Sequence, residues 1–189
     1  MSGRVAIAFA VAAFAFEVAS VSMYSAAAGF GLTVEPSKLL ASGSGGASLI
    51  HWGSLIDMLG YLSLAPIVLY LRARYPASYV DLFAAAGLAV VVIGSIGAAW
   101  MAAAAPPLIN DYVSASAAQK QALLPAFATL YRAVVLGLWQ TLEAFPLTVW
   151  LLGTAYAARR EGPRAVFWIL LVLGAVIGAT ATYRLTTGR

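Results

Sequence analysis

The chain has no cysteine, one histidine and few charged residues, and each scarcity excludes a class of chemistry. The absence of Cys among its 189 residues excludes disulfides and thiolate catalysis. His51 is the only histidine, so one chain cannot supply both axial imidazoles of a b-type haem. No lysine lies within an apolar run, which excludes a retinal Schiff base. The HExxH, nucleophile-elbow and Walker patterns are also absent, so an enzymatic function is not favoured.

Charge is scarce and apolar residues are abundant, and this balance indicates a lipid environment. Charged residues make up 10% of the chain, hydrophobic residues make up 62%, and the mean hydropathy is +0.90. A soluble domain has about 25% charged and about 45–50% apolar residues. A water-soluble fold of this length could not bury so much apolar surface. The composition therefore predicts an all-α, polytopic transmembrane helical bundle that forms a single domain over residues 1–189.

Five apolar runs are long enough to cross a bilayer, which needs about 20 residues per helix. They cover residues 5–30, 49–71, 81–105, 133–158 and 165–183. The glycine-rich segment 42–46 is expected to be a flexible surface loop, and Pro106 and Pro107 are expected to end the third span. The mixed segment 114–132 is expected to form a helix that lies partly in the interface and continues into the fourth span after a bend at Pro125; a sixth crossing there is the alternative.

Arginine is concentrated on one side of the expected spans. Arg72 and Arg74 follow the second span, residues 159–164 connect the fourth and fifth, and Arg4 precedes the first. Loops rich in arginine remain in the cytoplasm. We therefore expect a bacterial cytoplasmic (inner) membrane protein with its N-terminus inside and its C-terminus outside. Two further arginines, Arg184 and Arg189, depart from this pattern and would fit a sixth crossing.

Three carboxylates interrupt the apolar runs, in three different spans. A charge at the bilayer centre costs roughly 2.5–3.5 kcal/mol, so such groups are paired, neutralised or turned toward water. At 100° per residue, each carboxylate shares a helix face with an aromatic residue. The candidate ion- or substrate-binding residues are therefore Glu17, Asp57, Glu143, Tyr24, Tyr61 and Trp139. The alternative is that these polar groups only bind helices together, at about 1 kcal/mol each.

His51 is a further candidate, near the outer end of the second span. A single imidazole could ligate haem or a metal together with a carboxylate, although a lone histidine at this depth is more often a polar end group. The residues indicate no particular cofactor and no metal site. Small residues indicate helix packing: Gly174 and Gly178 form a GxxxG motif, and Gly87 and Gly94 share a face.

Several short segments carry a resemblance to a known family. They are residues 57–61 (DMLGY), 69–72 (LYLR), 138–143 (LWQTLE) and 151–153 (LLG). Together they resemble an uncharacterised family of small bacterial multi-pass membrane proteins, catalogued as a domain of unknown function. The resemblance implies a polytopic helical fold, often with one more span, and implies no activity.

Two functions from different classes fit these observations. The first is a small proton- or cation-linked transporter or channel-like protein that acts as a homo-oligomer, with the carboxylates as its ion site. The second is an accessory or structural subunit that packs against a larger membrane complex through small-residue faces. A membrane enzyme or cofactor-binding protein that uses His51 is a third, less favoured reading. The expected partners are the bilayer and other membrane chains; nucleic acid is not expected, because the basic residues occupy short loops.

Overall fold

The structure, a computed structural model, describes residues 1–29, 35–75 and 79–187, except the side chains of residues 160 and 161. Helices make up nearly all of these residues, and no strand occurs among them. The long helices are α1 (Gly3–Ala28), α3 (Gly43–Arg74), α4 (Val80–Ser114), α6 (Ala144–Glu161) and α7 (Arg164–Thr187). Between α4 and α6 lie α5 (Ala117–Tyr131) and the π-helix η1 (Arg132–Leu142), and the short α2 (Pro36–Leu40) precedes α3. The predicted all-α fold is confirmed.

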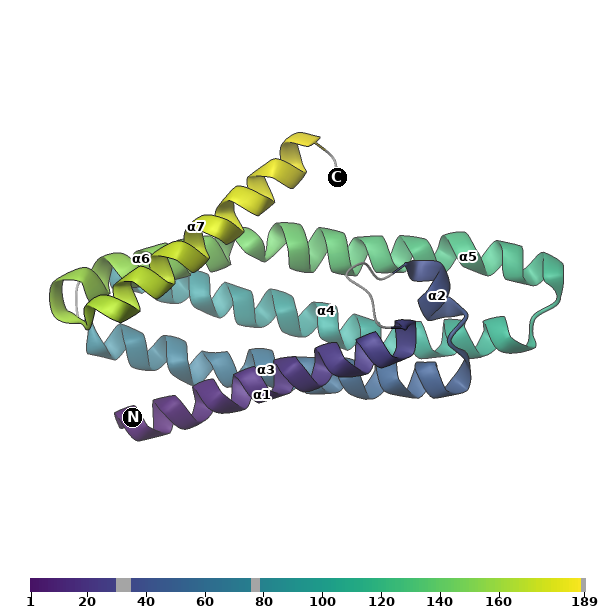
Figure 1. Cartoon of the computed structure of the whole chain (residues 1–189), viewed down its shortest axis with the longest axis horizontal. Coiled ribbons are helices and arrows are strands. Elements are labelled where there is room, and N and C mark those ends of the chain that lie inside the picture. Colours follow the sequence, from purple (N-terminus) through teal and green to yellow (C-terminus); the bar gives the residue numbers. More distant parts are fainter. Residues whose placement is uncertain (30–34, 76–78, 188–189) are drawn as a thin grey trace.

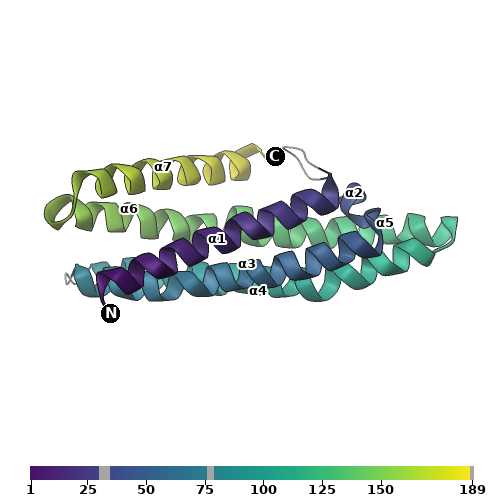
Figure 2. The ribbon, with the colours of Figure 1, turned by 60° about the horizontal axis from the view of Figure 1, so that its bottom comes forward.

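Five helical stretches are long and apolar enough to cross a membrane, as predicted. They are α1, α3, α4, the stretch Ala117–Arg159 and α7, and they run along the long axis of the bundle (Figures 1 and 2). The chain is therefore a multi-pass α-helical membrane protein. One end of the bundle, called here the arginine end, holds Arg4, Arg72, Arg74, Arg159 and Arg164. The opposite end, called the hairpin end, holds the connection between α4 and α5.

The glycine-rich segment 42–46 is largely helical, so the prediction of a flexible loop there was wrong. Gly43 has φ 75°, a left-handed conformation that suits glycine, and it turns the chain from α2 into α3. Gly46 is buried, and a Cβ at this position would lie 3.9 Å from Ala27 Cβ of α1. The small residues thus allow α1 and α3 to approach each other. At the end of α1, Gly29 has φ 78°; the expected boundary at residue 30 lies outside the described residues.

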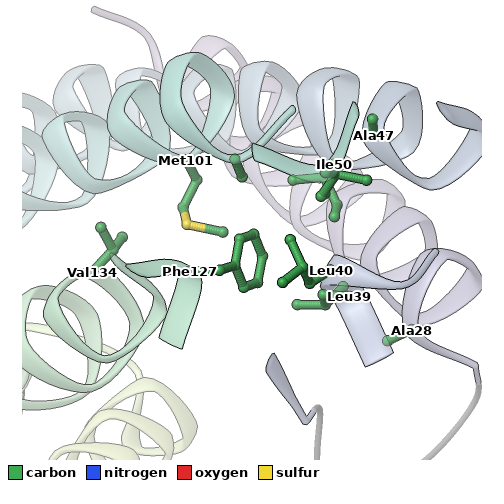
Figure 3. Close-up of a cluster of buried hydrophobic side chains, with 10 residues drawn as sticks. Ala28, Leu39, Leu40, Ala47, Ile50, Met101, Phe127 and Val134 are labelled. Atoms are coloured by element: carbon green, nitrogen blue, oxygen red, sulfur yellow. The ribbon is translucent and has the colours of Figure 1, made fainter. Parts of the chain in front are cut away.

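A cluster of buried side chains joins α2 to the hairpin end. Leu39 and Leu40 of α2 are fully buried together with Phe127 of α5. Ile50 of α3 and Met101 of α4 complete the contact, and Figure 3 shows these side chains converging from four helices. The apolar side of α5 therefore packs on protein.

The mixed segment 114–132 was predicted to form a helix that continues into the fourth span, and α5, η1 and α6 do follow one another as one long helix, antiparallel to α4 (Figure 1). Phe127 of this segment is fully buried against residues of α2 and α4. The interfacial position of the segment stays a prediction. Because no turn separates α5 from the following span, this segment is not a sixth crossing. Arg184 ends near Gln140 of η1, to which it donates a hydrogen bond, and Arg189 lies outside the described residues.

The central helix is α4, and glycines allow its neighbours to reach it. Of its apolar window 39% is buried, against 11–22% in the other four spans. A Cβ at Gly87 would lie 2.8 Å from a methyl carbon of Val68 in α3. A Cβ at Gly94 or Gly97 would overlap the ring of Tyr61 or Trp139. Close backbone approach of this kind is a main source of helix association in lipid.

Pro106 and Pro107 do not end α4, which continues to Ser114. A proline inside a helix removes one backbone N–H, so Pro106 leaves the carbonyl of Ala102 without its usual donor four residues later. The His51 ring on α3 fills this gap, because its Nδ1 lies 3.0 Å from the Ala102 oxygen. A carbonyl has no hydrogen to donate, so Nδ1 carries the proton. The helix thus continues through its two prolines, and a hydrogen bond from a side chain of α3 replaces one lost backbone hydrogen bond.

The last helix, α7, packs on α6 through the predicted small-residue motif. A Cβ at Gly174 would lie 2.8 Å from Leu152 Cδ2, and one at Gly178 would lie 2.9 Å from Thr148 Cγ2. Toward the C-terminus α7 diverges from the bundle (Figure 1). The GxxxG motif therefore lies on a contact within the chain.

We expect Gly174→Leu and Gly178→Leu each to destabilise the protein by about 1–3 kcal/mol, because the added side chain must push α7 away from α6. Unfolding in mixed micelles measures the change. Ala175→Leu is the matched control, because Ala175 is exposed on the same helix. If both glycine variants unfold like Ala175→Leu, α7 does not pack on α6 through this motif.

We also expect His51→Leu to destabilise the protein by about 1–2 kcal/mol, because the Ala102 carbonyl loses its donor. In a Pro106→Ala background the cost should shrink, since the N–H of residue 106 can then bond to that carbonyl. A double-mutant cycle measures this coupling. Additive effects of the two substitutions would contradict the link between His51 and Pro106.

Candidate functional site

The three carboxylates of the apolar runs lie at similar depth in the bundle. Glu17 is in α1, Asp57 is in α3, and Glu143 joins η1 to α6. At 1.5 Å per residue, each lies roughly 20–27 Å along its helix from the arginine end. Helices of different direction thus bring the three side chains to one level.

Glycines on α3 bring Glu17 and Asp57 together. Gly46, Gly53 and Gly60 are spaced seven residues apart and lie close to α1. A Cβ at Gly60 would lie 3.9 Å from the backbone nitrogen of Glu17. Asp57 lies one turn from both Gly53 and Gly60, on the same stripe. Its carboxyl group therefore comes within hydrogen-bonding reach of the Glu17 carboxyl group.

Asp57 and Glu17 differ in their surroundings. Asp57 is only 6% exposed, and no N–H or O–H group of the described residues donates a hydrogen bond to it. Its one polar contact at hydrogen-bonding reach is the Glu17 carboxyl group. Glu17 is exposed on the flank of the bundle. A buried carboxylate needs a proton or a cation to offset its charge.

Glu143 has a hydrogen-bond donor on α3. Tyr61 Oη donates to Glu143 Oε2 at 3.0 Å, and Glu143 is 6% exposed. The preceding π-helix η1 sets the direction of this residue: the Glu143 N–H bonds to the Leu138 carbonyl five residues earlier, at 2.8 Å. A π-helix holds more residues per turn than an α-helix, and such turns often occur at functional sites. It rotates Glu143 relative to the face that an uninterrupted α-helix would give.

Two aromatic side chains are held by hydrogen bonds to protein. Ser54 Oγ donates to the Ile50 carbonyl at 2.7 Å, so it accepts from Tyr24 Oη, which lies 2.5 Å away. Trp139 Nε1 donates to the Gly94 carbonyl at 3.2 Å. The indole reaches this oxygen because Gly97 has no side chain in its way. The polar atoms of Tyr24 and Trp139 are therefore bonded to α3 and α4.

A cavity of about 370 Å³ lies between α1 and the stretch of α5 and η1, with α3 on its third side. Its acidic and aromatic lining residues are Glu17, Tyr24, Asp57, Tyr61, Tyr131 and Trp139. No arginine, lysine or histidine of the described residues lines it. This volume is in the range of small-molecule pockets, about 300–1,000 Å³.

Of the predicted site residues, Glu17, Tyr24, Asp57, Tyr61 and Trp139 line the cavity. Glu143 does not line it but bonds to Tyr61, and His51 bonds to Ala102 outside it. Gly87 and Gly94 contact Val68 and Tyr61, as described above. Among the described residues, no group of three His, Asp or Glu side chains could hold a metal ion.

Sequence reasoning missed three features of the site. Tyr131 lines the cavity, although it falls in the segment predicted to be interfacial. The seven-residue spacing of Gly46, Gly53 and Gly60 was a visible signal for the α1 contact, but the first of these glycines lay in the segment read as a loop. Gly97, which admits Trp139, could have been found from its position one turn after Gly94.

Comparisons with known proteins add no relative: no family model, no curated protein and no solved structure matches the chain.

Proposed function

We propose that this protein is a small proton- or cation-linked transporter, with Glu17, Asp57 and Glu143 as its ion site. The observation that carries the proposal is Asp57, a carboxyl group that is 6% exposed and lines a cavity, and whose one partner in hydrogen-bonding reach among the described residues is a second acid, Glu17. An ionisable residue within a span is costly, and such residues mark ion pathways and proton relays. Groups that only bind helices together would be paired with a complementary hydrogen-bond donor or acceptor, as the Tyr24 hydroxyl group is with the accepting Ser54 Oγ.

The cavity also fits a transporter in its position. It opens on the flank of the bundle beside Glu17, which is exposed. Tyr61 lines the cavity with Glu17 and Asp57 and donates a hydrogen bond to Glu143, so the acidic groups lie along a series of side chains from three helical stretches. Protons can pass along such a series of carboxyl and hydroxyl groups.

The second candidate is an accessory subunit of a larger membrane complex. The observation that favours it is that Glu17 is exposed on the flank of the bundle, where a neighbouring helix would cover it. A homo-oligomer would cover it equally well, and we include assembly with further copies in the proposal. The two candidates differ in whether neutral carboxylate variants lose an activity of the isolated protein.

We further propose that the protein is inserted in a bacterial cytoplasmic membrane with the arginine end inside. The support is the arginine content of that end, which follows the positive-inside rule. The continuous helix from α5 to α6 makes the number of crossings odd, so the C-terminus would then be outside.

Cysteine labelling tests this orientation, and the chain has no native cysteine to interfere. Ser44 and Ala73 are exposed near the hairpin end and the arginine end, respectively. We expect a membrane-impermeant maleimide to label Ser44→Cys in intact cells and Ala73→Cys only after permeabilisation. The opposite pattern would invert the orientation.

Neutral variants test the transport proposal. We expect Asp57→Asn and Glu143→Gln to fold at near-native yield, because an amide keeps the size of the side chain and removes a charge that is costly in lipid. At least one should lower proton flux into liposomes by roughly tenfold or more, since an amide cannot carry the proton. A pH-sensitive dye inside the liposomes measures the flux.

The matched controls are Asp111→Asn and Glu35→Gln, which make the same chemical changes at exposed residues outside the cavity. They should leave the flux unchanged. If wild type and both site variants show the same flux, or none above empty liposomes, the transport proposal fails and the accessory-subunit function is favoured.

A further inference from the structure

The cavity beside Asp57 is lined by aromatic rings as well as by acid. Tyr24, Tyr61, Tyr131 and Trp139 come from α1, α3, α5 and η1. Three of them use their hydroxyl or N–H group in a hydrogen bond to protein. The rings therefore contact a bound molecule mainly through their π faces. Aromatic faces attract cations, and clusters of them recognise quaternary ammonium groups.

The ionisable groups that line the cavity are acidic, so the lining attracts a cation. Glu17 and Asp57 both line the cavity, and no basic side chain does. Asp57 is 6% exposed and lacks a donor among the described residues, so its charge is not offset by the protein itself. The other titratable groups that face Asp57 are Tyr24, Tyr61, Tyr131 and Glu143, and none of them carries positive charge.

Size and ligand number argue against a bare metal ion as the occupant. Calcium requires six to eight oxygen ligands and magnesium near-ideal octahedral coordination. The described residues offer no group of three acidic or imidazole side chains for a metal. The cavity, of about 370 Å³, also has room for an organic molecule.

We propose that this cavity binds a monovalent organic ammonium ion, which displaces one proton shared by Glu17 and Asp57. Two carboxyl groups at hydrogen-bonding reach share one proton, because like charges so close cannot both be ionised. An ammonium ion beside them offsets this repulsion, so the proton leaves as the cation enters. The total charge of the occupied site stays the same. This inference rests on the proposed function and adds its substrate class and its coupling.

The lateral opening gives the ligand a route. Glu17 is exposed on the flank of the bundle, and Val21 and Ser25 continue the cavity along α1 toward the hairpin end. A cation with an apolar body partitions into the bilayer and can reach the site from that side. The recognised class is therefore a quaternary ammonium ion, or a protonated amine, that carries an apolar group.

The probe is benzyltrimethylammonium, compared with neopentylbenzene, which has the same shape without the charge. Calorimetric titration of the full chain in detergent, in buffers of different ionisation enthalpy, reports both affinity and proton release. We expect one ammonium ion to bind per chain with release of about one proton, and the neutral compound to bind at least about tenfold more weakly with no release. Sodium chloride at equal concentration should release none.

Variants separate the roles of ring and acid. Asp57→Asn should abolish proton release, whereas Asp111→Asn should not change it. Tyr131→Leu should weaken ammonium binding, and Tyr131→Phe, which keeps the aromatic ring, should preserve it. Both variants should fold, because no hydrogen bond of the Tyr131 hydroxyl group is seen among the described residues. Trp168→Leu, on the exposed side of α7, is the control for loss of an aromatic residue.

The outcomes distinguish this inference from the proposed function. Equal binding of the charged and neutral compounds would show an apolar pocket and overturn the ammonium assignment. Proton release by sodium but not by the ammonium probe would also overturn it, while leaving cation-linked transport standing. If no cation releases a proton and Asp57→Asn leaves the liposome flux unchanged, both proposals fail.

Discussion

Close approach to α4 is the constraint on which the rest of the structure depends. Gly94 and Gly97 leave space for the rings of Tyr61 and Trp139, which come from helices on different sides. Tyr61 in turn holds Glu143, and Trp139 closes one wall of the cavity. Two missing side chains on α4 thus decide where the ring of Tyr61 in α3 and the indole of Trp139 in η1 lie. In lipid such contacts replace the hydrophobic drive that would order a soluble core.

Lost backbone hydrogen bonds impose the second constraint, because lipid offers no water to replace them. Pro106 lies within α4, and His51 donates to the carbonyl that this proline leaves free. The single histidine of the chain is therefore explained by helix continuity. The same continuity extends α4 beyond the expected span and lets it pair with α5 at the hairpin end, where Phe127 is buried.

The candidate site combines features that lipid makes costly with features that favour a ligand. Asp57 is buried, and within the part of the chain that the structure describes its one partner in hydrogen-bonding reach is a second acid, Glu17. A protein gains no stability from such a pair unless a proton or a cation completes it. The aromatic lining and the opening beside Glu17 provide π surface and volume, neither of which is required to bind a proton. These two features are the physical argument for an organic cation.

The sequence by itself determined that the chain lies in lipid, is helical and has five spans. An apolar run of about 20 residues is long enough to cross a bilayer, and in lipid it satisfies its backbone hydrogen bonds by forming a helix. It also determined that Glu17, Asp57 and Glu143 are exceptional, and helical spacing placed each on a face with an aromatic residue. The tertiary structure alone decided that these three faces meet, that Tyr131 joins them and that His51 does not. The reason is that the spans are apolar on nearly every side, so the hydrophobic pattern does not select which face turns inward. Contacts between helices select the inward face: glycines permit close approach, and hydrogen bonds such as that from Tyr61 to Glu143 fix the orientation. The wider turn of η1 also rotates the residues that follow it, and the pattern of apolar residues does not predict that turn.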